Sequence, residues 1–119
     1  MNLTRSEDGE EFPCTNIFWE FILQTARKGG WEPLGTVKFD QALNKDQTWD
    51  GTDYHSNNGQ VVTPDDAFNI SKSLKKVIAS EENGLTPEEH HALREFIEWL
   101  KIEDYEDDGI DYFPGFEIY

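Results

Sequence analysis

Two segments of the chain carry the same helix-start pattern, an apolar residue followed by Thr, Pro and two acidic residues. They are residues 62–66 and 85–89. A Thr side chain caps the free amide groups at a helix start, Pro fits the first helical position, and the helix dipole favours carboxylates there. The pattern therefore predicts helices that begin at Pro64 and Pro87. The residues after the two starts do not match each other, so we interpret the repetition as shared capping chemistry and not as a duplicated unit.

Apolar residues recur at helical spacing after both starts and in a third segment, residues 16–28. Thr15 is placed to cap this earlier helix, and Gly29-Gly30 is placed to end it. Its apolar face is the broadest of the three, so we predict that it is the central helix. The predicted faces are Ile17, Phe18, Phe21, Ile22 and Ala26, widened by Trp19 and Leu23, for the first helix; Ala67, Ile70, Leu74, Val77 and Ile78 for the second; and Leu93, Phe96, Ile97 and Leu100 for the third.

The segments outside the helices carry weaker patterns. Residues 1–13 are charged and contain Gly and Pro, which predicts an irregular N-terminal arm. In residues 36–48 no period dominates, and we expect a loop with at most one helical turn. Asn57-Asn58-Gly59 favours a turn, which would pair residues 54–56 with 60–62 as a short hairpin. The aromatic tail, residues 112–119, is expected to dock as a strand beside that hairpin.

These expectations define the fold class as mainly α (α+β). We predict a three-helix core with a short β-hairpin and a C-terminal strand-like tail. With 119 residues, the chain has the length of one domain, residues 1–119.

The charge of the chain limits its partners. It has 25 acidic and 10 basic residues, a formal net charge of −15. Such a field repels phosphates, so we expect neither nucleic acid nor an anionic membrane as a partner, and we expect a basic protein instead. The sequence has no apolar run of about 18 residues and no signal-peptide pattern at its start, and its one cysteine, Cys14, has no pairing partner; we expect a cytoplasmic location.

The most concentrated set of polar and aromatic residues lies in residues 49–60. A small pocket walled by rings is one interpretation, with His55 as an acid or base oriented by Asp50 or Asp53. The other interpretation is structural: Gly51 and Gly59 permit turns, Asx side chains close them, and the rings anchor the loop to the core. The candidate binding residues are Trp49, Asp50, Asp53, Tyr54, His55 and Asn57.

Metal sites have weaker support. Asp104, Glu106, Asp108 and Gly109 match the opening of a calcium-binding loop, but its twelfth position is Gly115, where a bidentate Glu is needed. A solvated acidic turn is the simpler interpretation. His90 and His91 are neighbours and point roughly 100° apart on a helix, and His91 with Glu95 supplies only two ligands. We therefore expect no metal and no cofactor.

The run Trp49-Asp50-Gly51, Tyr54, Ser56-Asn57-Asn58-Gly59-Gln60 and Val62, followed by a helix, resembles a recurrent pattern in small uncharacterised bacterial proteins. Gly30-Trp31 and the tail Gly115-Phe116-Glu117-Ile118-Tyr119 are similar to segments of the same family. The resemblance implies a bacterial cytoplasmic protein with a compact, mainly helical fold. It brings no established activity and no catalytic residues.

The sequence favours a non-enzymatic protein-binding module that neutralises a basic partner, in the manner of toxin-immunity proteins. Two alternatives remain at this point. One is a small-molecule-binding or hydrolytic protein with its site at residues 49–60. The other is a calcium-binding module that uses residues 104–109.

Overall fold

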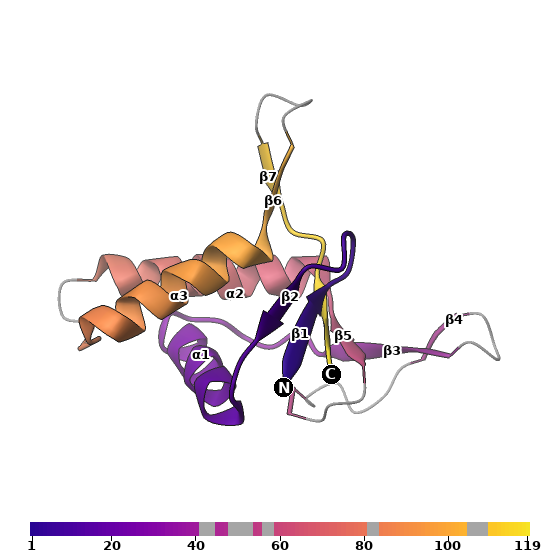
Figure 1. Ribbon diagram of the computed structural model, residues 1–119, viewed down its shortest axis with the longest axis horizontal. Helices are drawn as coiled ribbons and strands as arrows, with labels where there is room; N and C mark the ends of the chain where they lie inside the picture. The colour runs from indigo at the N-terminus through magenta and orange to yellow at the C-terminus, as the bar shows by residue number, and fades with distance from the viewer. Residues whose placement is uncertain (41–44, 48–53, 56–58, 81–83, 105–109) are drawn as a thin grey trace.

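The protein is described here by a computed structural model that covers residues 1–40, 45–47, 54–55, 59–80, 84–104 and 110–119. Figure 1 shows three helices gathered beside an antiparallel sheet, with two narrow hairpins projecting from the body. The helices are α1 (Asn16–Lys28), α2 (Pro64–Ala79) and α3 (Pro87–Leu100). The strands are β1 (Asn2–Arg5), β2 (Glu11–Pro13), β3 (Thr36–Asp40), β4 (Lys45–Gln47), β5 (Gln60–Val62), β6 (Ile102–Asp104), β7 (Ile110–Tyr112) and β8 (Phe116–Ile118).

The three helices begin at the residues that the capping patterns predict. The side chains of Thr15, Thr63 and Thr86 each accept a hydrogen bond from the backbone amide three residues later. At α3 the arrangement is a complete capping box, because the Glu89 side chain also accepts from the Thr86 amide. The helix starts are local features, and local chemistry was sufficient to locate them.

The prediction of a mainly α fold is wrong, because strands form a substantial sheet in the order β2-β1-β8-β5-β3-β4. The inner part of β3 pairs with β5, through Thr36 and Val37, and its outer part pairs with β4. β6 and β7 pair separately as a hairpin. The fold is therefore α+β, with the sheet as a second structural layer beside the helices.

Three local predictions change with the fold class. Residues 1–13 are no irregular arm: they contain β1 and β2, which pair as a hairpin. Of residues 36–48, where we expect a loop with at most one helical turn, residues 36–40 and 45–47 form β3 and β4, and the others lie outside the described residues. The predicted hairpin of residues 54–56 with 60–62 is also wrong. Of residues 54–56, Tyr54 and His55 are described and lie in no strand, and β5 pairs with β3 and β8 instead.

The C-terminal tail docks as a strand, as predicted, but at a more central position than expected. β8 lies between β1 and β5, so the chain ends meet inside the sheet (Figure 1). Asn2 and Tyr119 exchange both backbone hydrogen bonds, with N–O distances of 2.9 and 2.8 Å. A strand pairing of this kind is not visible in local sequence, because pairing between residues at opposite ends of a chain leaves no local period.

Aromatic rings join the helices to the sheet. Trp19 of α1 and Phe96 of α3 both contact Phe116 of β8 edge-on, with ring centroids 5.8 and 6.3 Å apart. Phe12 of β2 and Trp99 of α3 extend the same cluster. Because each large ring buries much area per residue, this cluster supplies a core that the low apolar content of the chain would not otherwise provide.

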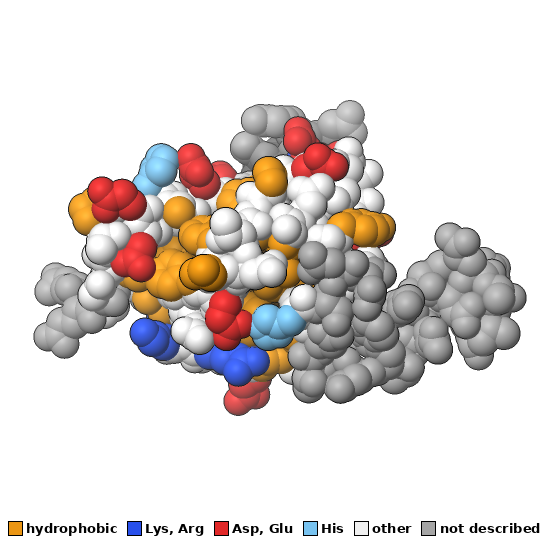
Figure 2. All heavy atoms as spheres, turned by 60° about the horizontal axis from the view of Figure 1, so that its bottom comes forward, with side chains coloured by type: hydrophobic (Ala, Val, Ile, Leu, Met, Phe, Trp, Pro, Cys, Tyr) orange, Lys and Arg blue, Asp and Glu red, His pale blue; other side chains and the backbone are white. Residues whose placement is uncertain are grey.

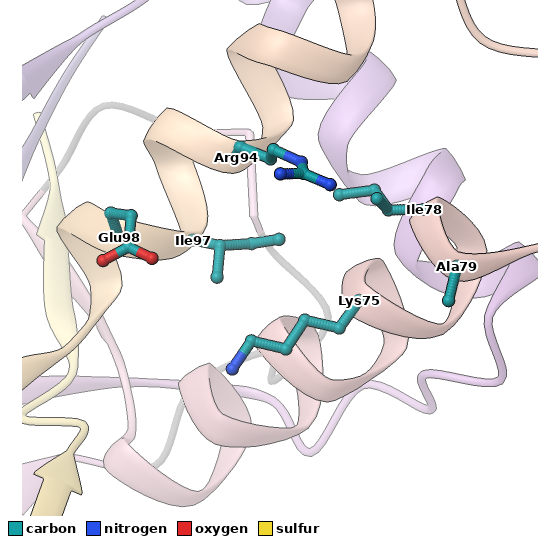
Figure 3. Close-up of a pocket in the computed structure, with 6 residues that line it drawn as sticks. All are labelled: Lys75, Ile78, Ala79, Arg94, Ile97 and Glu98. Atoms are coloured by element: carbon teal, nitrogen blue, oxygen red, sulfur yellow. The ribbon is translucent and has the colours of Figure 1, made fainter.

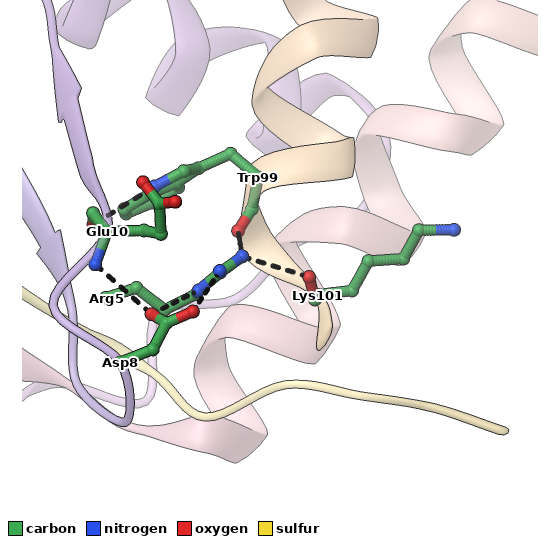
Figure 4. Close-up of polar contacts among 5 residues, drawn as sticks. All are labelled: Arg5, Asp8, Glu10, Trp99 and Lys101. Atoms are coloured by element: carbon green, nitrogen blue, oxygen red, sulfur yellow. Dashed lines mark hydrogen bonds and ion pairs between the residues drawn. The ribbon is translucent and has the colours of Figure 1, made fainter. Parts of the chain in front are cut away.

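The β1–β2 hairpin holds the C-terminal end of α3 (Figure 4). The Arg5 guanidinium donates to the backbone carbonyls of Trp99 and Lys101, at 2.7 and 3.1 Å, and forms an ion pair with Asp8. In return, the Trp99 indole donates to the carbonyl of Glu10 at 3.2 Å. The hairpin thus satisfies carbonyl groups that a helix end leaves without intrahelical partners.

Candidate functional site

Four of the six candidate binding residues, Trp49, Asp50, Asp53 and Asn57, lie outside the described residues. The calcium-loop residues 105–109 also lie outside them, and only the backbone of Asp104 is described, at the end of β6. Tyr54 and His55 are described, and the structure places them in different environments. One is buried and the other is exposed.

Tyr54 is a structural anchor. Its side chain is 1% exposed, and its hydroxyl donates to Asp66 Oδ2 at 2.6 Å while accepting from the Gly35 amide at 2.9 Å. Its backbone carbonyl accepts from the Trp19 indole at 2.6 Å. Burial, together with the hydrogen bond to the Asp66 carboxylate, raises the pKa of the Tyr54 hydroxyl. Every polar group that Tyr54 uses in this way holds the protein core together.

Asp66 is the centre of this buried polar network, and the sequence interpretation did not identify it. Its carboxylate is fully buried; besides the Tyr54 hydroxyl it accepts from the Trp31 indole at 2.8 Å and from the Leu34 amide at 3.3 Å. Three donors compensate for the desolvation of the charge. One signal was available in the sequence: Asp66 precedes Ile70 by four residues and Leu74 by eight, so it lies on the buried face of α2.

His55 lies at the surface, with its side chain 58% exposed, and its Nε2 is paired with Glu20 Oε2 of α1. The hydrogen bond from His55 lowers the pKa of the Glu20 carboxyl. The pair therefore connects the segment that contains Tyr54 and His55 to the outer face of α1. Tyr54 and His55 are neighbours in the sequence, but Tyr54 packs in the core and His55 lies at the surface.

The outer face of α1 carries apolar side chains that the core does not use. Of the predicted apolar face, Ile22 and Ala26 are buried, as are Trp19 and Leu23, but Ile17 is 84% exposed. Phe18 and Phe21 are half-buried, with ring centroids 6.1 Å apart. A shallow hollow of about 410 Å³ lies on this face, lined by Asn16, Ile17, Glu20, Phe21 and Gln24.

Figure 2 shows the side of the molecule on which α1 lies, with apolar side chains spread among acidic ones. Glu20 accepts a hydrogen bond from Gln24 at 3.1 Å, so the carboxylate is held beside the apolar residues of the same helix. We call Ile17, Phe18, Glu20 and Phe21 the α1 face. This face combines exposed apolar area with an oriented negative charge.

A second hollow, of about 540 Å³, lies between α2 and α3 (Figure 3). Ile78, Ala79 and Ile97 supply its apolar wall, and Lys75, Arg94 and Glu98 supply charged groups. In Figure 3 the Arg94 guanidinium extends toward Ile78, while the Lys75 side chain extends along α2. The hollow is open and mixed in charge, and neither Lys75 nor Arg94 forms an ion pair with a described side chain.

Two further findings concern metals and membranes. Within the described ranges, no group of three or more His, Cys, Asp and Glu side chains is close enough to hold a metal ion. His91 instead pairs with Glu95 at 3.0 Å on the surface of α3. None of the helices among the described residues has both the length and the apolar character that crossing a membrane requires.

Comparisons with known proteins yield no match: no protein-family model, no curated protein and no solved structure is similar to this chain.

Proposed function

We propose that the chain is a non-enzymatic protein-binding module that engages a basic partner protein in the cytoplasm through the α1 face. The observation that carries the proposal is the exposure of Ile17, 84%, on a helix whose core-facing side is already complete. An apolar residue that contributes nothing to the core of its own protein is available to the core of an interface.

Neighbouring residues strengthen the case for an interface at this position. Phe18 and Phe21 are half-buried aromatic residues next to Ile17, and aromatic side chains dominate the energetics of protein interfaces. The hollow beside them, about 410 Å³, offers a place for a protruding side chain of a partner. The α1 face therefore has the apolar centre of a typical binding patch.

Charge selects the class of partner. The net charge of −15 attracts a basic protein over long range and repels an acidic one. Glu20, held by His55 and Gln24, places a carboxylate directly beside the apolar residues. A tight inhibitor of a basic enzyme, as toxin-immunity proteins are, needs this combination of apolar contact and negative steering.

The test compares the wild-type chain with Ile17→Lys and Phe21→Lys, immobilised and exposed to a lysate of the source cells. Leu34→Lys is the matched control, because Leu34 is also exposed, 59%, but does not belong to the α1 face. We expect the wild type and the control to capture the same basic protein at low salt. Both α1 variants should reduce its affinity at least about tenfold, which corresponds to roughly 1.4 kcal/mol.

Melting temperatures provide the fold control, and the Ile17 variant should melt with the wild type since Ile17 is exposed. The proposal is rejected if no basic protein is captured at low salt. It is also rejected if the captured protein binds both α1 variants as tightly as it binds Leu34→Lys.

A further inference from the structure

A small hollow lies on the outward side of α2, away from the α1 residues that carry the proposed function. It has a volume of about 260 Å³ and is lined by Phe68, Ser71, Lys72 and Lys75 of α2 and by Phe113, which follows β7. Ser71, Lys72 and Lys75 follow Phe68 by three, four and seven positions, so the four α2 residues form one stripe on the helix surface. Together with Phe113, the hollow combines two rings, two cations and one hydroxyl.

Ser71 is the unusual residue in this hollow. Its side chain is 1% exposed, and its Oγ has no hydrogen-bond partner in the part of the chain that the structure describes. Buried hydroxyl groups nearly always have a partner, because an unpaired one loses its bonds to water without replacement. Ser71 also lines the hollow, so an acceptor bound there can supply the partner that this hydroxyl lacks.

Lys72 and Lys75 supply the charge that this acceptor needs. Both are exposed, and neither forms an ion pair with any described side chain, although the chain contains 25 acidic residues. Against an overall charge of −15, two adjacent unpaired cations create a local site that attracts an anion. Lys72 follows Ser71 directly and Lys75 lies one turn later, and all three residues line the same hollow.

The apolar part of the site comes from Phe68 and Phe113. Their ring centroids are 5.4 Å apart and the ring planes meet at 72°. Phe68 is 49% exposed, so part of its side chain remains available to a ligand. An edge-to-face pair of this kind offers an apolar corner to a second ring or a short alkyl chain.

We propose that this hollow binds a small organic carboxylate, in which the carboxylate meets Ser71, Lys72 and Lys75 and the apolar part lies against Phe68 and Phe113. The hollow, of about 260 Å³, has room for a molecule of this kind. Benzoate and hexanoate have both features. The neighbouring hollow of Figure 3 shares Lys75 but is lined by the carboxylate of Glu98, and none of its lining residues has a buried unpaired polar atom.

The proposal is tested by titrating the isotope-labelled chain with four probes and following backbone amide signals. We expect saturable shifts for benzoate and hexanoate, centred on Ser71, Lys72 and Phe113. Inorganic phosphate has the charge without the apolar part, and benzyl alcohol has the ring without the charge; each should bind at least about tenfold more weakly.

Variants locate the site. Ser71→Ala and the double variant Lys72→Gln with Lys75→Gln should each weaken benzoate binding about tenfold or more, because a hydrogen bond to a charged group is lost. Lys76→Gln is the matched control, since it removes one charge from the same helix but Lys76 does not line this hollow. The Ser71→Ala variant should also melt at or above the wild-type temperature, because it removes an unpaired buried hydroxyl.

Three results would overturn the proposal: no saturable shift with benzoate or hexanoate, equal affinity for inorganic phosphate, or unchanged benzoate binding by Ser71→Ala and the double lysine variant. The outcome is independent of the α1 face, because no residue of this hollow belongs to α1.

Discussion

Arg5 and Trp99 are 94 positions apart in the sequence, yet the Arg5 guanidinium donates a 2.7 Å hydrogen bond to the backbone carbonyl of Trp99. The last turn of α3 carries no basic side chain of its own. The N-terminal strand therefore provides the cation that the negative end of the helix dipole favours. The group that caps a helix end usually comes from a residue close in sequence, but here it comes from β1.

Replacing Arg5 should therefore destabilise the whole fold. Arg5→Gln removes the charge and the hydrogen bonds to Trp99 and Lys101, and we expect a loss of about 2 kcal/mol in the free energy of unfolding. Urea unfolding followed by tryptophan fluorescence measures this loss. Arg94→Gln on the same helix is the control and should change stability by less than about 0.5 kcal/mol. Equal effects of the two variants would show that Arg5 does not act as a cap.

The ion pair of Arg5 with Asp8 predicts a sensitivity to acid. Hydrogen bonding to Arg5 lowers the pKa of the Asp8 carboxyl to about 2 in the folded protein, whereas an unfolded Asp titrates near about 4. A lowered folded pKa gives stability that is complete above the unfolded pKa and is lost as the pH falls through the folded pKa. Between about pH 4 and pH 2, the wild type should lose more stability than Asp8→Asn. Thermal melting of both proteins across this range measures the difference, and parallel curves would contradict the prediction.

The buried network predicts a large effect of a single hydroxyl. Tyr54→Phe leaves the Asp66 carboxylate with one donor fewer and the Gly35 amide without an acceptor. We expect a loss of about 2 to 3 kcal/mol in the free energy of unfolding, measured by urea denaturation. Tyr119→Phe is the control, since the Tyr119 hydroxyl pairs with Glu117 at the surface, and it should cost less than about 1 kcal/mol.

Tyr54 also predicts how stability changes at alkaline pH. Its pKa is raised in the folded protein, so its contribution is complete below the unfolded pKa of about 10 and is lost as the pH rises through the folded value. The difference in melting temperature between the wild type and Tyr54→Phe should therefore be constant from about pH 7 to pH 9 and shrink above about pH 10. A difference that grows with pH would show the opposite sign of shift.

Substitutions at two adjacent glycines, Gly29 and Gly30, distinguish a steric clash from backbone strain. A Cβ at Gly29 would lie 2.2 Å from the backbone oxygen of Ser73, so Gly29→Ala should push α1 away from α2. A Cβ at Gly30 meets nothing within 4 Å, but its φ of +100° disfavours any other residue. We expect Gly29→Ala to cost about 3 kcal/mol or more and Gly30→Ala to cost about 1 to 2 kcal/mol. Urea denaturation compares them, and the reverse order would mean that the two helices separate easily.

The sequence predicted the helices well and the sheet poorly, for one physical reason. A helix start such as Thr86-Pro87 contains its own capping partners within four residues. A strand such as β1 has only four residues, and its pairing depends on β8 at the far end of the chain. Leu3 is fully buried in it, but one apolar residue between polar neighbours gives no readable alternation.

For the candidate site, too, the sequence predicts some features and misses others. The structural one of the two interpretations makes Tyr54 an anchor, because an aromatic residue in a polar loop is a common sign of attachment to a core, and the Tyr54 side chain is buried. Its partner Asp66 was interpreted only as a helix-start acid, like its exposed neighbour Asp65. The exposure of Ile17 was not foreseen either, since periodicity gives the relative phase of apolar residues but not which of them the rest of the fold will cover.

The position of β8 between β1 and β5 has a consequence for the order of folding. The helices can form early from local contacts, but the two halves of the sheet, β2-β1 and β5-β3-β4, stay separate until this last strand inserts between them. Until then, β1 and β5 each present an open edge to other molecules. Refolding at high concentration should thus compete with aggregation at this one step, and an added peptide with the sequence of residues 114–119 would occupy the same slot and slow closure.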